Sequence, residues 1–127
     1  MHIVFIDDEE VTHDSINLCL FSTEYKLKSF FNPQEALNYL LNTEDKIDII
    51  LLDLMMHGFH GIEVLNMIKK IPKIKNVPVV IQTSINKPED IAKCMHLGAD
   101  YYLQKPYNKE DLIKVFENVK NTRSSSS

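Results

Sequence analysis

The sequence predicts a single α/β domain, built on a doubly wound parallel sheet of five strands with five helices. Two observations support this prediction. Short apolar runs alternate with longer amphipathic stretches, and the runs are continuously apolar, as in strands that are buried on both faces of a parallel sheet. The chain has 127 residues, of which 44% are hydrophobic and 25% charged. That length fits one domain with a core and leaves no room for a fused output module.

Three of the expected strands are short and rich in branched side chains, which is typical of central strands of such a sheet. They are Ile3–Ile6, Ile49–Leu52 and Val79–Ile81. Two further runs, Leu27–Phe30 and Tyr101–Leu103, border polar residues and are expected nearer the edges of the same sheet.

The intervening stretches carry helix signals. Apolar residues recur at the spacing of one helix face within Ala36–Leu41 and within Leu112–Val119. Asn32–Glu35 supplies an N-cap, a proline at the first helical position and a capping-box glutamate. Pro88 begins another helix, and Gly98 follows it where a left-handed residue is needed to end it.

Composition disfavours several classes of function. Fourteen basic against eighteen acidic residues give a formal net charge of −4, so direct nucleic-acid binding is not expected. No apolar run reaches the roughly 18 residues of a membrane span, and the first strand leaves no space for a signal peptide, so a cytoplasmic protein without membrane contact is expected. Cys19 and Cys94 lie far apart and are expected to be reduced. The domain is expected to span residues 1–121, followed by a disordered polar tail at 122–127.

Polar residues follow the expected strands at the edge where parallel strands end. Asp7 and Asp8 follow the first strand, Asp53 the third, Thr83 the fourth and Lys105 the fifth. Three carboxylates in one crevice repel each other unless a cation neutralises them, and hard oxygen ligands favour Mg²⁺. A hydroxyl and an ammonium beside them suit the oxygens of a phosphoryl group. The set therefore predicts a site for phosphoryl transfer.

Each part of this set has a plainer interpretation when taken alone. Acids in Asp7–Glu10 favour the start of a helix, and an aspartate after a strand is often a cap. Thr83 and Ser84 suit a turn, and Lys-Pro is a common loop dipeptide. The functional interpretation depends on their coincidence at one edge of the sheet.

In combination, these residues resemble the receiver domain of bacterial two-component response regulators over residues 2 to about 121. The matching motifs are Phe5–Glu9, Leu51–Met56, Gln82–Ser84, Gly98–Tyr102 and Leu103–Pro106. The resemblance implies a flavodoxin-like sheet of strand order 2-1-3-4-5. It also implies a single-domain signalling protein that switches conformation to bind a partner, with no enzymatic activity beyond its own phosphorylation and dephosphorylation.

The resemblance assigns roles at the acidic residues. Asp53 matches the aspartate that accepts a phosphoryl group, as 4-aspartylphosphate, from a histidine kinase or a histidine phosphotransfer protein. Asp8 matches the direct Mg²⁺ ligand, and Asp7 its neighbour acting through water. Met55 matches the position whose backbone carbonyl binds the ion, which explains why an apolar side chain is accepted there.

It assigns further roles near the end of the chain. Thr83 matches the switch hydroxyl, Tyr102 the aromatic that turns inward with it, and Lys105 the cation that binds a phosphoryl oxygen. The Lys105–Pro106 bond is expected to be cis. The downstream protein is expected on the face made by the fourth helix, the fifth strand and the fifth helix.

A few residues depart from the pattern or remain outside it. His57 stands where the family usually has proline, and Ser84 where it often has alanine. Met55 and Ile85 flank the path of an attacking water, and two apolar groups there suggest slow self-dephosphorylation. His57 and His60 form an H-x-x-H pair, which is interpreted as two loop histidines in solvent because further metal ligands are not nearby in sequence.

Three other functions compete with this interpretation. A Mg²⁺-dependent aspartyl-phosphate phosphohydrolase carries its nucleophile in a D-x-D pattern on the first strand, which Asp7–Glu9 does not match. A receiver-shaped interaction module that takes no phosphate would not need the complete acidic, hydroxyl and lysine set. A flavin-binding domain of the same topology is disfavoured, because the acids after the first strand would repel its phosphate.

Overall fold

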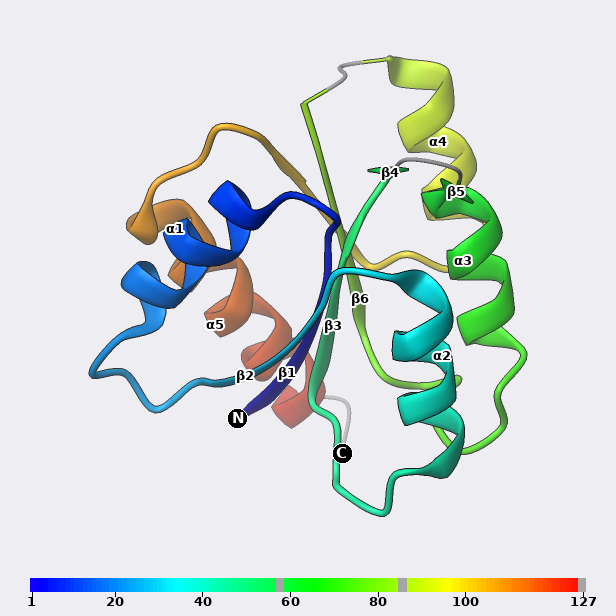
Figure 1. The fold of residues 1–127 in the computed structure, drawn as a ribbon, viewed down its shortest axis with the longest axis horizontal. Coiled ribbons are helices and arrows are strands. Elements are labelled where there is room, and N and C mark those ends of the chain that lie inside the picture. The colour runs from blue at the N-terminus through cyan, green and yellow to red at the C-terminus, as the bar shows by residue number, and fades with distance from the viewer. Residues whose placement is uncertain (57–58, 85–86, 126–127) are drawn as a thin grey trace.

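The computed structural model describes the backbone of residues 1–56, 59–84 and 87–125, and a five-stranded parallel sheet runs through its centre (Figure 1). The strand order is β2-β1-β3-β6-β7, which is the predicted order once two short strands outside this sheet are set aside. The strands are β1 (His2–Ile6), β2 (Lys26–Phe30), β3 (Ile49–Asp53), β6 (Val79–Thr83) and β7 (Tyr101–Gln104). The predicted fold class is confirmed.

Five helices cover the two faces of the sheet, as predicted. They are α1 (Glu10–Leu20), α2 (Pro33–Asn42), α3 (Gly61–Lys69), α4 (Pro88–His96) and α5 (Lys109–Ser125). Helices α1 and α5 lie on one side, and α2, α3 and α4 lie on the other (Figure 1). Among these helices, none combines the length and apolar character that a bilayer crossing requires.

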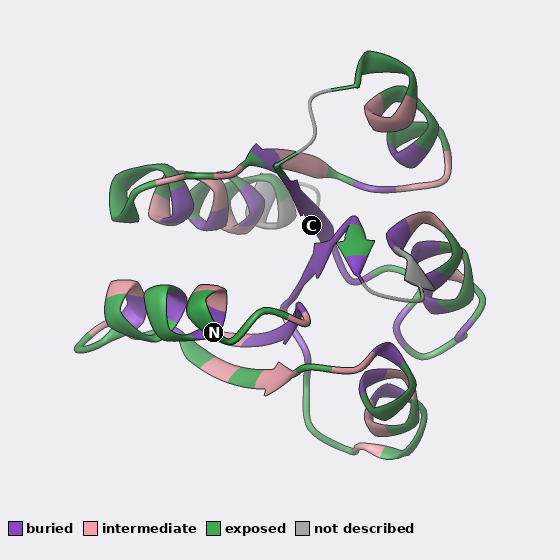
Figure 2. Cartoon of the chain, turned by 45° about the horizontal axis from the view of Figure 1, so that its top comes forward, coloured by how far each residue is buried: buried purple, intermediate pink, exposed green. Residues whose placement is uncertain are grey.

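Two hydrophobic cores lie on the two faces of the sheet, because successive strand residues point in opposite directions. Phe5 packs into the core beneath α1 and α5, while its neighbour Ile6 packs into the core beneath α2, α3 and α4. Leu51 and Leu52 divide in the same way. Burial is therefore concentrated in the central strands and on the inward faces of the helices (Figure 2). Each such fully buried side chain stabilises the fold by about 1.5–3 kcal/mol.

The cysteines follow this division between the two cores. Cys19 packs against the core beneath α1 and α5, and Cys94 is buried in the other core. Both are free thiols, as predicted.

Local signals for helix ends are confirmed. The Asn32 side chain accepts hydrogen bonds from the backbone N–H groups of Gln34 at 2.7 Å and Glu35 at 3.4 Å, and Pro33 opens helix α2. Gly98 follows helix α4 with a φ of 110°, a conformation that glycine adopts without steric cost. The Lys105–Pro106 bond is cis, as expected.

Two features near the ends of elements differ in detail from the sequence prediction. Strands β4 (Met55–Met56) and β5 (Phe59–His60) form a small antiparallel pair directly after β3, and two residues each are too few for a periodic signal. Helix α5 continues through Ser125, so its described part enters the segment 122–127 that was expected to be a tail. The domain boundary at residue 121 stays a prediction.

Candidate functional site

The predicted acidic residues meet at the carboxyl edge of the sheet. Asp7 follows β1, and Asp53 is the last residue of β3. These two strands are neighbours at the point where the chain order of the sheet reverses, which is where open α/β sheets bind ligands. One carboxylate oxygen each from Asp7, Asp8, Glu9 and Asp53 lies within 4.8 Å of the others. The structure thus brings together the three predicted acids, and adds Glu9, for which no role was predicted.

Lys105, from the loop after β7, places one cation among these acids. Its Nζ lies 2.8 Å from Asp7 Oδ2, 3.6 Å from Asp53 Oδ2 and 3.8 Å from Glu9 Oε1. Burial lowers the pKa of the Lys105 ammonium, but the hydrogen bond to Asp7 and the surrounding carboxylate charges outweigh it, and the net shift of the pKa is upward. The backbone N–H of Lys105 donates to the Thr83 carbonyl at 2.9 Å, which fixes the start of the loop.

Asp53 is deeply buried, yet its carboxylate forms few hydrogen bonds with the described residues. Its residue exposure is 2%, and its Oδ1 accepts only a long hydrogen bond of 3.4 Å from Met55 N. Its Oδ2 has no hydrogen-bond partner among the described residues. Burial, and then the negative charge of Asp7, raise the pKa of Asp53 to about 7, while Lys105 and the Met55 N–H oppose the rise. A buried acid with an oxygen that accepts no hydrogen bond is suited to meet a cation or an electrophile.

The donor set of this site fits a hard divalent cation. All four ligand groups are carboxylates, which are the oxygen donors that Mg²⁺ and Mn²⁺ prefer. Asp53 Oδ2 supplies a ligand atom that accepts no hydrogen bond from the part of the chain that the structure describes. One lysine among four acids also leaves the cluster negatively charged, so a cation would remove repulsion.

Asp7 is held far more tightly than Asp53. Its Oδ1 accepts from Glu9 N at 2.8 Å, and its Oδ2 accepts from both Lys105 Nζ and Gln82 Nε2, each at 2.8 Å. Asp7 is 0% exposed, whereas Asp8 is only half-buried. These environments suit the predicted division between an acid acting through water and an acid that contacts an ion directly, although both roles stay predictions.

Sequence reasoning missed the polar side chains that support Asp7. Gln82 in β6 is 0% exposed and donates to Asp7 Oδ2, and its Oε1 accepts a hydrogen bond from the Tyr107 hydroxyl. Burial, and then the charge of Asp7, raise the pKa of the Tyr107 hydroxyl. The available signal was a lone amide at the end of the apolar run Val79–Ile81.

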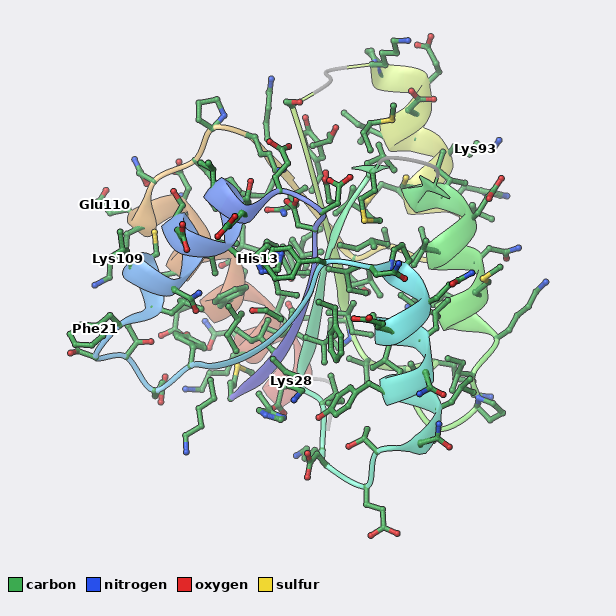
Figure 3. All side chains as sticks on the ribbon, in the orientation of Figure 1. His13, Phe21, Lys28, Lys93, Lys109 and Glu110 are labelled. Carbon is green, nitrogen blue, oxygen red and sulfur yellow. The ribbon has the colours of Figure 1, made fainter. Side chains whose placement is uncertain are left out.

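His13 on α1 supports Asp7 from the other side and was also missed. Its Nε2 donates to the Asp7 carbonyl oxygen at 2.6 Å, because a carbonyl can only accept. The ring stacks on Phe31 at a centroid distance of 3.8 Å and lies 4.6 Å from the ring centroid of Phe5. His13 is labelled near the centre of the molecule in Figure 3. His13 thus anchors helix α1 to the end of β1.

The predicted switch residues lie on neighbouring strands beside the acids. Thr83 ends β6 and is 0% exposed. Tyr102 lies on β7 opposite Ile81, and its buried hydroxyl has no hydrogen-bond partner among the described residues. Ile85 and His57 lie outside the described residues, as does the His60 side chain, so the predictions on water access and on the histidine pair stay predictions.

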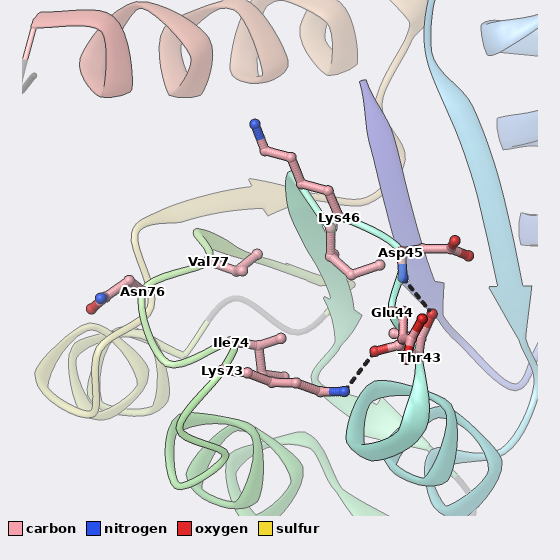
Figure 4. A pocket seen from close by; sticks show the side chains of 9 residues that line it. Thr43, Glu44, Asp45, Lys46, Lys73, Ile74, Asn76 and Val77 are labelled. Atoms are coloured by element: carbon pink, nitrogen blue, oxygen red, sulfur yellow. Dashed lines mark hydrogen bonds between the residues drawn. The ribbon is translucent and has the colours of Figure 1, made fainter.

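One pocket is remote from the acids. It measures about 560 Å³ and is lined by Thr43–Ile47 after helix α2 and by Lys73 and other residues before β6 (Figure 4). Lys73 Nζ donates to the Thr43 carbonyl at 2.6 Å across this pocket. It lies at the amino-terminal end of the central strands, so it is separate from the acidic site.

Comparisons with known proteins agree with this geometry. The family model for the response regulator receiver domain matches residues 3–117. The chain is 32% identical over 118 residues to the two-component response regulator ORR11 of Oryza sativa subsp. indica, covering 93% of this chain and 80% of that protein.

Solved structures show the same fold. The chemotaxis protein CheY4 of Vibrio cholerae superposes with a TM-score of 0.85 at 24% identity, covering 93% of this chain and 97% of that one. The Mn²⁺-bound form of response regulator Rcp1 superposes with a TM-score of 0.77 at 25% identity, covering 94% and 91%. The chain therefore belongs to the response regulator receiver domain family of two-component phosphorelay signalling.

Proposed function

We propose that Asp53 is the phosphoacceptor of this receiver domain and that its phosphorylation changes the shape of the protein so that it binds a partner. Receiver domains of this family are phosphorylated by histidine kinases or phosphotransfer proteins. The observation that carries the proposal is the buried Asp53 carboxylate, whose Oδ2 accepts no hydrogen bond from the described residues and lies 3.6 Å from Lys105 Nζ. Family membership favours neither a phosphohydrolase nor a module that takes no phosphate.

A divalent cation is part of this proposal. Asp8 and Asp53 would hold Mg²⁺ directly, Asp7 through water, and Met55 through its backbone carbonyl. When bound, the ion supplies positive charge against the dianionic phosphoryl group. The carboxylate cluster supports this assignment, and the Mn²⁺-bound form of the similar protein Rcp1 favours a divalent ion.

The side chains of the site divide the work of phosphoryl transfer. An oxygen of the ionised Asp53 attacks phosphorus, the bond from phosphorus to the donor nitrogen breaks, and the donor imidazole leaves with the bonding electrons. The Lys105 ammonium pairs with Asp7 and is also close to Asp53. It can therefore leave Asp7 and bind an oxygen of the phosphoryl group on Asp53. The hydroxyl of Thr83 then donates a hydrogen bond to a second phosphoryl oxygen. Charge neutralisation and positioning are the main catalytic effects available for such a transfer.

The proposed output is a local shape change that reaches the face made by α4, β7 and α5. Movement of Thr83 toward new acceptor oxygens opens space beside β6. Tyr102 on the adjacent strand has a buried hydroxyl without a described partner, so turning inward breaks no hydrogen bond to another described residue. A downstream protein that binds this face would sense the change.

The decisive experiment is incubation with acetyl phosphate and Mg²⁺ followed by intact mass measurement. The native protein is expected to gain the mass of one phosphoryl group, and Asp53→Asn none. Asp14→Asn, which removes the same charge from an exposed position on α1, is the matched control and should be modified like the native protein. A native chain without added mass, or an Asp53→Asn chain with as much, would refute the assignment.

A further inference from the structure

A series of hydrogen bonds links Asp7 of the acidic cluster through Gln82 to Tyr107, in the loop before helix α5. Gln82 is 0% exposed, and it follows the apolar residues Val79–Ile81 in β6. Burying an amide costs free energy unless both its donor and its acceptor find partners. Both do here, because Nε2 reaches Asp7 Oδ2 at 2.8 Å and Oε1 accepts from the Tyr107 hydroxyl.

The chemistry of Asp7 fixes the direction of the hydrogen bonds from Tyr107 to Gln82 and from Gln82 to Asp7. A carboxylate paired with lysine only accepts, so the NH₂ side of the Gln82 amide must face Asp7. The carbonyl side of the amide then faces Tyr107, and only the hydroxyl proton of Tyr107 can complete the bond. Tyr107 therefore holds the Gln82 amide in the one orientation that gives Asp7 a donor.

Asp7 Oδ2 consequently has two donors that differ in mobility. Lys105 has a long side chain whose Nζ lies within 3.8 Å of three different carboxylates, so small movements change its partner. Gln82 projects from the end of a central strand and is bonded at both ends of its amide. When Lys105 transfers to a phosphoryl oxygen, Gln82 is the donor that remains on Asp7.

We propose that Gln82 and Tyr107 are positioning residues for phosphoryl transfer, which keep Asp7 in place while Lys105 leaves it for the phosphoryl group. This inference rests on the proposed function of Asp53. Without Gln82, the Asp7 carboxylate either rotates away from its position beside Asp8 or keeps Lys105 for itself. The first outcome weakens cation binding, and both outcomes slow the reaction.

The test compares Gln82→Met and Tyr107→Phe with the native protein. Gln82→Met keeps the length of the side chain and removes its donor, and Tyr107→Phe removes one oxygen. The rate constant of phosphorylation at saturating acetyl phosphate is expected to fall about tenfold to a hundredfold in Gln82→Met, since a hydrogen bond to a charged group is lost. A fall of several-fold is expected in Tyr107→Phe.

Two further measurements separate positioning from general structural damage. Calorimetric titration with Mg²⁺ alone, without phosphodonor, should show a severalfold weaker dissociation constant in Gln82→Met. In the double variant, Tyr107→Phe should cause no additional fall, because Tyr107 acts only through Gln82. Gln104→Met on the neighbouring strand β7, where the glutamine is exposed, is the matched control and should behave like the native protein.

The possible outcomes distinguish this inference from the proposed function. If the native protein takes no phosphoryl group on Asp53, the proposed function fails. If the native protein is phosphorylated but Gln82→Met equals it in rate and in Mg²⁺ binding, only the positioning role fails. Additive effects of the two substitutions would also overturn the role. Should Gln82→Met fail to fold, Tyr107→Phe alone decides, and a rate equal to that of the native protein refutes the inference.

Discussion

Removing the charge of Asp53 is expected to stabilise the metal-free protein at alkaline pH. Asp53 is 2% exposed, and burial together with the charge of Asp7 raises its pKa from an ordinary value of 3.8 to about 7. The folded state therefore disfavours the ionised form. For a carboxyl with a raised pKa, the contribution to stability is present at low pH and is lost as the pH rises from about 4 through about 7. Asp53→Asn is nearly isosteric and never ionises.

The size of the effect follows from the two pKa values. Their difference is about 3, and each pKa unit corresponds to about 1.4 kcal/mol. Asp53→Asn should therefore increase the free energy of unfolding by up to about 4 kcal/mol at pH 8, and by less than about 1 kcal/mol at pH 4. Lys105 keeps a partner in the variant, because it lies 2.8 Å from Asp7.

The assay is urea unfolding followed by circular dichroism, from pH 4 to pH 8, with EDTA present. Asp14→Asn changes the net charge equally at an exposed site and should show little pH-dependent gain. Mg²⁺ should stabilise the native protein more than Asp53→Asn, since a ligand that binds only the folded state adds stability. Equal stability of the native protein and Asp53→Asn at pH 8, or a difference that does not change with pH, would refute the electrostatic reasoning.

Three other substitutions test separate parts of the site. Lys105→Met should slow phosphorylation by acetyl phosphate about a hundredfold, because the cation that reaches Asp53 is lost; stopped-flow rates within twofold of native would contradict this role. Met55→Asn should speed the decay of the phosphorylated protein, measured by intact mass over time, because a polar group then guides the attacking water; an unchanged decay rate would count against the slow-hydrolysis hypothesis. Gly61→Ala should destabilise the fold by about 1–3 kcal/mol in urea unfolding, since its Cβ would lie 2.5 Å from Leu54 Cα and 2.6 Å from the Asp53 carbonyl oxygen. A variant as stable as the native protein would contradict this steric argument.

The fold was predictable because local and global signals agree. Ile49–Leu52 is apolar at every position, which is typical of a strand buried on both faces, and the structure buries each of these residues. Asn32 and Gly98 mark helix ends for stereochemical reasons that do not depend on the rest of the chain. The positions of Asp7 and Asp53 then follow, because parallel strands end at one edge.

The support around the acids was less predictable. Gln82 is a neutral residue whose partner Tyr107 lies in the loop after β7, 25 residues further along the chain. No sequence motif connects two residues at that separation. His13 resembles any polar residue on a helix until the stacking with Phe31 is known. Strands β4 and β5 are held by pairing with each other, and two residues in each strand are too few to give a periodic signal in the sequence.

Hydrogen bonds of the Asp7 backbone connect the end of β1 to strand β2 and to helix α1. The Asp7 backbone N–H donates to Phe30 O on β2 at 3.1 Å, and its carbonyl is bound by His13 of α1. Tyr25 donates to Glu117 at 2.9 Å and so fastens the start of β2 to α5. Across the site, Tyr102 has a buried hydroxyl without a described partner. From these contacts we expect helix α1 and strand β2 to stay in place, and a displacement that begins at the proposed phosphoacceptor Asp53 to reach β7 and α4.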